Sequence, residues 1–161
     1  MILKFYKAQK AQGLLFIFIG FIAIILSLHF VFNANNIFSN GLTLPLFIIG
    51  ILQVYFGINT FQNTPIHLLL VQGFVRENKA SMATIEIPFI HKEILFQKKM
   101  INTCLILIAL AILFLFIFNN TLFLQGLGIG LFIQSLIVIT ANYFAAQRSQ
   151  IYLKWLNDYY N

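Results

Sequence analysis

Four long stretches without a charged residue constrain this chain more than any other feature. They comprise residues 13–32, 42–61, 101–118 and 122–146, and none of them contains Asp, Glu, Lys or Arg. Each can cross about 30 Å of hydrocarbon as a helix, because an α-helix rises about 1.5 Å per residue. Backbone N–H and C=O groups must be satisfied internally in lipid, which disfavours open strands. The sequence therefore predicts an all-α integral membrane protein with four transmembrane helices.

The composition agrees with this prediction along the whole chain. Of the 161 residues, 60% are hydrophobic and only 9% are charged, whereas a soluble domain carries about 25% charged residues. A water-soluble protein is excluded. We expect a single membrane domain over residues 1–161, with a polar connection at 62–100 and a polar tail at 147–161.

The basic residues predict the orientation of the chain. All ten precede the first stretch, separate the second from the third, or follow the fourth: Lys4, Lys7, Lys10, Arg76, Lys79, Lys92, Lys98, Lys99, Arg148 and Lys154. The loops at 33–41 and 119–121 carry no charge. Lys and Arg in short loops are retained in the cytoplasm, so both termini are expected there. The net charge of +6 is then a topology signal, and we expect lipid rather than nucleic acid as the partner.

The chain also resembles itself at an offset of 85 residues. The matching pairs are Phe38 and Phe123, Gly41 and Gly126, Leu42 and Leu127, Leu46 and Leu131, Phe47 and Phe132, Ile48 and Ile133, and Gln62 and Gln147. This pattern predicts two tandem helical hairpins, related as parallel repeats about an axis along the membrane normal.

Two prolines divide the polar connection at 62–100. Pro is tolerated in the first turn of a helix, so Pro65 and Pro88 are expected to begin two short amphipathic helices near the cytoplasmic interface. The alternation over residues 84–87 is also typical of a strand, and that alternative stays open. In the tail, Trp155 and Tyr152 are expected as interfacial anchors.

The sequence offers no recognisable catalytic, metal or cofactor site. All four acidic residues lie outside the apolar stretches: Glu77, Glu86, Glu93 and Asp158. Conventional ion coupling needs an ionisable group at membrane depth, where His29 is the only histidine. No Cys-x-x-Cys or His-x-x-x-His spacing is present. Cys104, the single cysteine, is expected to pack as a small residue. We therefore expect a protein that is not an enzyme.

The apolar stretches do carry stripes of small and amide residues at helical spacing. The candidates are Gly50, Gln53 and Gly57 in the second stretch, and Gly126, Gly130 and Gln134 in the fourth. Small residues let helices approach closely, and amides can hydrogen-bond across the contact. The stripes either pack the bundle internally or receive another membrane-embedded chain.

The end of the chain resembles a family of small four-helix bacterial inner-membrane proteins. The likeness lies in Gly-Leu-Gly-Ile-Gly-Leu-Phe-Ile-Gln at 126–134, in Asn-Tyr-Phe-Ala-Ala-Gln-Arg at 142–148 and in Ile-Tyr-Leu at 151–153. This chain has Asn142 where the family has Asp and Ala146 where it has Glu, and Glu86 lacks the Arg-Met that follows it there. Some members look like immunity partners of secreted antibacterial effectors. The resemblance implies a multi-pass protein of the bacterial inner membrane.

These observations favour non-catalytic protein binding, specifically immunity against a membrane-targeting antibacterial toxin. One alternative is a small channel or carrier formed by homo-oligomerisation, with Gln53, Gln134 and Asn59 lining the route. Another is an accessory subunit of a larger membrane complex.

Reporter fusions test the predicted topology. Fusions after Asn36 and Thr121 are expected to report from the periplasm, and fusions after Lys79 and Asn161 from the cytoplasm, because every basic residue lies on one side. Alkaline phosphatase and fluorescent-protein fusions provide the measurement. A cytoplasmic signal at Asn36 would overturn this layout.

Overall fold

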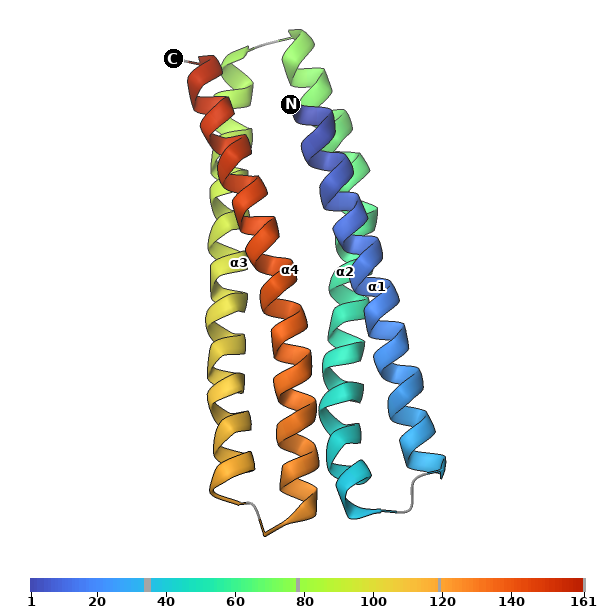
Figure 1. Cartoon of the computed structure of the whole chain (residues 1–161). Helices are drawn as coiled ribbons and strands as arrows, with labels where there is room; N and C mark the ends of the chain where they lie inside the picture. The colour runs from blue at the N-terminus through green and yellow to red at the C-terminus, as the bar shows by residue number, and fades with distance from the viewer. Residues whose placement is uncertain (34–35, 78, 119, 161) are drawn as a thin grey trace.

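A computed structural model of the chain contains four long α-helices in the part that it describes (Figure 1). They are α1 (Ile2–Asn33), α2 (Ile37–Glu77), α3 (Lys79–Phe116) and α4 (Leu122–Tyr160). The structure describes residues 1–33, 36–77, 79–118 and 120–160, without the side chains of residues 75–83 and 160. All four helices are long and apolar enough to cross a membrane. The structure confirms the prediction of an all-α chain with four helices that have the length and composition needed to cross a membrane.

The polar connection does not form the two separate short helices that the prolines suggested. Pro65 lies inside α2, and Pro88 lies inside α3. A proline inside a helix costs about 3 kcal/mol because it removes one backbone hydrogen bond. Packing outweighs that cost here, since Val71 and Ile90 on the extended segments are buried in one apolar cluster. Residues 84–87 are helical rather than extended, and the side chains of Arg76 and Glu77 in the polar connection lie outside the described residues.

The tail likewise continues a helix, because α4 runs on to Tyr160. With 41 residues, α2 is about 60 Å long, roughly twice the thickness of a hydrocarbon core. The bundle therefore extends well beyond its apolar stretches. Figure 1 shows that this extension lies at the end that carries both chain termini.

Helices α1 and α2 pack along a seam of small residues. Three pairs face one another at intervals of seven residues: Gly13 with Gly57, Gly20 with Gly50, and Ser27 with Thr43. A Cβ atom on Gly20 would lie 2.6 Å from the carbonyl oxygen of Gly50, closer than any side chain can approach. Only glycine permits this backbone contact. A large apolar side chain at the same position, such as those elsewhere on α1, would keep the two helices apart.

Helices α3 and α4 pack in the same manner, with Gly128 of α4 against the backbone of Ala111 in α3. The two helix pairs meet through α2 and α4, where Gly41 touches the carbonyl of Phe123 and Gly126 touches the carbonyl of Phe38. These two contacts are reciprocal, and the offset of 85 residues converts one into the other. Helices α2 and α3 touch only sparsely, and so do α1 and α4. The bundle is therefore loosely closed both between α2 and α3 and between α1 and α4.

Two alanine substitutions test the glycine contacts. Gly126→Ala places a Cβ against the Phe38 carbonyl and is expected to destabilise the bundle by about 1–3 kcal/mol. The matched control is Gly73→Ala, whose Cβ meets nothing within 4 Å; it is expected to gain about 0.5–1 kcal/mol from helix propensity. Thermal unfolding in detergent provides the comparison. Equal stability of the two variants would contradict the packing described.

Candidate functional site

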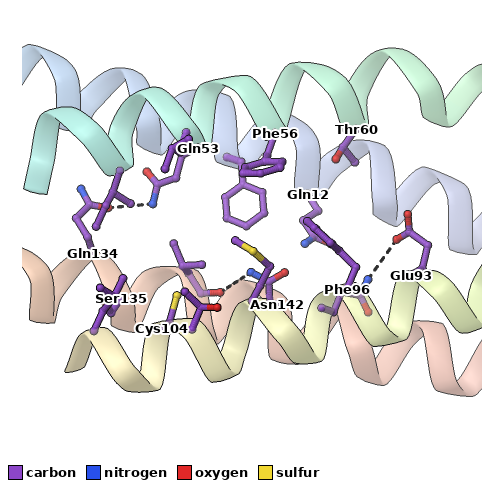
Figure 2. Close-up of a pocket in the computed structure, with 18 of the residues that line it drawn as sticks. Gln12, Gln53, Phe56, Thr60, Glu93, Phe96, Cys104, Gln134, Ser135 and Asn142 are labelled. Atoms are coloured by element: carbon purple, nitrogen blue, oxygen red, sulfur yellow. Dashed lines mark hydrogen bonds between the residues drawn. The ribbon is translucent and has the colours of Figure 1, made fainter. Parts of the chain in front are cut away.

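A chamber of about 200 Å³ lies between the two helix pairs and is lined from all four helices (Figure 2). Its apolar wall includes Phe16 of α1, Phe56 of α2 and Phe96 of α3. The Phe56 and Phe96 rings stand 6.0 Å apart, between α2 and α3, which touch only sparsely. The polar side chains that line the chamber are Gln9, Gln12, Gln53, Thr60, Glu93, Gln97, Thr103, Gln134, Ser135 and Asn142.

A second cavity of about 140 Å³ continues the chamber toward the end with the chain termini. It shares Gln9, Thr60 and Glu93 with the first, and it adds His67 and Phe89, whose rings stack 4.2 Å apart. The two cavities together therefore lead from the middle of the bundle toward one end.

A hydrogen bond closes the deep end of the chamber. The Gln53 amide of α2 donates from Nε2 to Oε1 of Gln134 in α4 at 2.9 Å, and both residues are buried. Figure 2 shows the two amides pointing toward one another, with Glu93 at the other end of the view. Beyond this bond, the close contacts of Gly41 and Gly126 join α2 to α4.

Several polar atoms in the chamber wall have no hydrogen-bond partner among the described residues. They are the Oε1 atoms of Gln9, Gln53 and Gln97 and the Oγ atom of Ser135. A buried acceptor without a partner costs about 1–3 kcal/mol. All four atoms belong to residues that line the chamber. The cost would be recovered by a ligand, or by water, that donates hydrogen bonds there.

Glu93 is the acidic residue that lines both cavities. Its Oε2 atom lies 3.4 Å from Nε2 of Gln9 and 3.5 Å from Nε2 of Gln97. Both distances exceed the usual range for a strong hydrogen bond, so the carboxylate is held loosely. No Lys or Arg lines either cavity in the part of the chain described. The carboxylate keeps acceptor capacity for a donor in the chamber.

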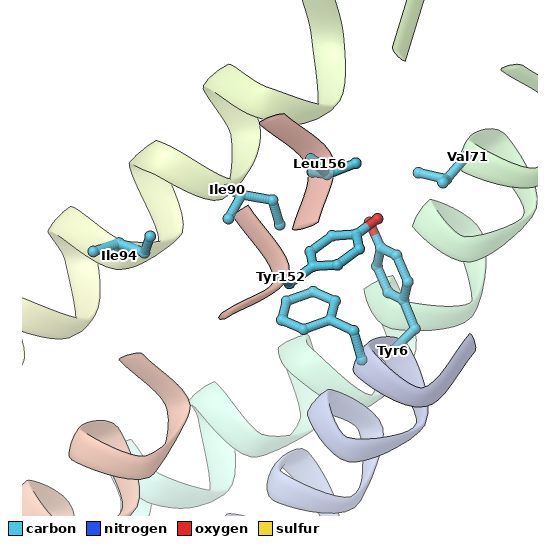
Figure 3. Packing of buried hydrophobic residues seen from close by; sticks show 7 residues of the cluster. Tyr6, Val71, Ile90, Ile94, Tyr152 and Leu156 are labelled. Carbon is cyan, nitrogen blue, oxygen red and sulfur yellow. The ribbon is translucent and has the colours of Figure 1, made fainter. Parts of the chain in front are cut away.

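A second buried carboxylate belongs to the helix extension. Glu86 is only 2% exposed, and its Oε1 accepts hydrogen bonds from the hydroxyls of Tyr6 at 2.7 Å and Tyr152 at 3.1 Å. Figure 3 shows the two phenol oxygens directed to one point. The Tyr152 ring also stacks on Phe5 at 4.3 Å. This cluster ties α3 to α1 and α4, so Tyr152 is a core residue rather than the interfacial anchor expected from the sequence.

The protonation of this cluster follows from its burial. Glu86 lies fifteen positions before the apolar stretch that begins at Ile101, outside the stretch expected in hydrocarbon. Burial raises the pKa of its carboxyl, and the two phenol donors partly offset the rise. Burial, and then the neighbouring Glu86 carboxylate, raise the pKa of Tyr6. The phenol therefore stays protonated and remains a donor.

The structure places all six stripe residues at contacts within the chain. Gly50 and Gly57 face α1, Gly126 and Gly130 face α2, and Gln53 and Gln134 bind each other. These contacts are those of internal packing, one of the two alternatives for the stripes. Both amides also border the chamber, as does Cys104, while Asn59 borders the second cavity.

Sequence reasoning missed the polar residues that α1 and α3 contribute to the chamber. Gln9 and Glu93 precede the apolar stretches at 13–32 and 101–118, whereas α1 and α3 begin earlier, at Ile2 and Lys79. A spacing of seven residues could have indicated the inner face of α3, since Ile90, Gln97, Cys104 and Ala111 are all buried.

Comparisons with protein families, with curated proteins and with solved structures found no match. Among the described residues, no group of three His, Cys, Asp or Glu side chains lies close enough to hold a metal ion. What the geometry offers is an apolar chamber with acceptors in its wall. That chemistry suits the binding of a ligand with donor groups.

Conservative substitutions test the buried carboxylate. Tyr6→Phe and Tyr152→Phe each remove one donor to Glu86 and are expected to cost about 1.5–3 kcal/mol, the usual value for a hydrogen bond to a charged group. Tyr55→Phe is the matched control, because Tyr55 is 63% exposed. Thermal unfolding in detergent measures all three. Unchanged stability of both cluster variants would show that the contacts contribute nothing.

Proposed function

We propose that this is a non-catalytic protein of the bacterial inner membrane that binds a membrane-embedded partner and gives immunity against a membrane-targeting toxin. In this proposal the helices form two tandem transmembrane hairpins with both termini in the cytoplasm. The partner is an apolar or amphipathic helix of the toxin, held where it cannot assemble into a lesion.

The opening between α2 and α3 is the observation that carries the proposal. Leu52 of α2 and Phe96 of α3 line the chamber and are also 48% and 47% exposed. Large apolar side chains thus flank a gap that leads to buried amides. A helix lying in the bilayer could place its apolar face on this mouth, as amphipathic helices do in helix-in-groove binding.

Two features of the chain support the location and the orientation. The basic residues that the structure describes at the extended end include Lys4, Lys7, Lys92 and Lys154, whereas the opposite end carries none. This distribution is typical of a cytoplasmic end. The likeness of the final stretch, including Gly126–Gln134, to small inner-membrane proteins that look like immunity partners supports the biological role.

A carrier is the second candidate, because the two cavities form one continuous route that stops at the Gln53 and Gln134 amides. Asn59 borders the second cavity, toward the end with the chain termini. The close contacts at Gly41 and Gly126 lie beyond the stop. A dead-end route suits a carrier open to one side better than a permanently open pore.

Bulky substitutions at the mouth test the docking proposal. Leu52→Trp and Phe96→Trp fill the opening. If the immunity proposal holds and a neighbouring gene encodes the toxin, both variants are expected to lower protection against it by about tenfold or more, as loss of a central contact does. Survival of producing cells and co-purification of the toxin in detergent are measured at matched protein abundance.

The control variants are Ile25→Trp and Ile106→Trp, whose side chains are 63% and 65% exposed and do not line the chamber. They are expected to protect fully. Full protection by the two mouth variants would refute docking at this site. Toxin-independent uptake or efflux of a small solute, lost in the mouth variants alone, would favour the carrier instead.

A further inference from the structure

We propose that the chamber binds an amphiphilic primary amine, with its ammonium group at Glu93 and its apolar body between the phenylalanine rings. The inference goes beyond the partner-binding role, because it concerns the interior of the bundle whatever docks at the mouth. It rests on three observations: the acceptors without partners, the charge of the wall, and the shape of the space.

The acceptors match the donors of an ammonium group in number and type. Gln9 and Gln97 both turn their amide nitrogens toward the Glu93 carboxylate, which leaves the two amide oxygens without partners. Gln9, Glu93 and Gln97 all line the chamber, so its wall holds a carboxylate and two amide carbonyls as acceptors. A primary ammonium has three donors and no acceptor. Gln97 is 7% exposed, so its oxygen is shielded from bulk water.

The charge of the wall favours a cation over a neutral donor. Glu93 is the acid of the chamber, and no Lys or Arg is among the described residues that line it. Arg148 donates to Oε1 of Gln12, and Lys10 lies over the Phe61 ring. The imidazole of His67, in the second cavity, stacks on Phe89. A charged ligand would therefore meet a carboxylate with no cation paired to it among the described residues.

The space fits an aromatic or aliphatic body. A cavity of about 150 Å³ holds a benzene molecule, and the chamber measures about 200 Å³. Phe16, Phe56 and Phe96 line it, and aromatic faces attract cations as well as apolar groups. The acceptors of Gln53 and Ser135 lie deeper in the chamber. Thr60, like Glu93, lines both cavities, and Gln53 is seven residues from Thr60 along α2, a rise of about 10 Å. A second donor on an elongated ligand would find them there.

The single cysteine supplies a reporter inside the chamber. Cys104 lines the wall and is 5% exposed. A ligand in the chamber should therefore slow the reaction of this thiol with methyl methanethiosulfonate. The rate is read by intact mass on the purified full-length protein in detergent, with glutathione in the same sample as a reference thiol.

The probes are 4-phenylbutylamine and its neutral analogue 4-phenyl-1-butanol. In the wild-type protein the amine is expected to protect Cys104 saturably, at a concentration about tenfold lower than the alcohol needs, since charge-assisted hydrogen bonds are roughly twice as strong as neutral ones. Glu93→Gln should remove this preference and leave protection by the alcohol unchanged. Asp158→Asn, at an exposed acid outside the chamber, should behave as wild type.

The comparison of the two probes on the wild-type protein needs no variant, so the test does not depend on the folding of Glu93→Gln. Equal protection by amine and alcohol would overturn the cationic ligand class. If neither probe slows the reaction of Cys104 relative to that of glutathione, the site itself is overturned. An amine preference that persists in Glu93→Gln would remove Glu93 as the ammonium partner.

Discussion

Close backbone contact at heptad-spaced glycines is the interaction on which the rest of this structure depends. In lipid, helices gain little from burying apolar side chains against each other, so association relies on close packing and interhelical hydrogen bonds. The pairs Gly13 with Gly57 and Gly20 with Gly50 bring α1 and α2 to backbone contact over two successive heptads. Large side chains are thereby directed away from the seam, toward the outside and toward the chamber.

The chamber lies between the two helix pairs, in the stretch between two sets of contacts that join them most closely. At one end, Gly41 and Gly126 press α2 and α4 together through their backbones. At the other end, Glu86 accepts hydrogen bonds from Tyr6 and Tyr152 and ties three helices to one another. Between these ends, Gln53 bonds to Gln134 and the Phe56 ring lies beside that of Phe96, and the side chains around them leave the chamber open. Two different kinds of interaction thus bracket one cavity.

The acceptors in the wall of that cavity are the basis of the binding role proposed. Amide oxygens and a loosely held carboxylate can accept hydrogen bonds from the donor groups of a ligand. A toxin helix at the mouth and an amine inside would use different parts of the same space. The first would contact Leu52 and Phe96 at the surface, and the second would reach Glu93 within.

The sequence by itself determined that the chain forms helices long and apolar enough to cross a membrane, because charge-free stretches are a local property. It also contained the seven-residue spacing of Gly13 and Gly20. It was misleading at Pro65 and Pro88, where burial of the helix extensions outweighed a local preference. Only the tertiary structure decided that Gln9 of α1 and Glu93 of α3 line one chamber. Their meeting depends on which helices pair and in what register, and no local pattern specifies contacts between side chains so distant in the chain.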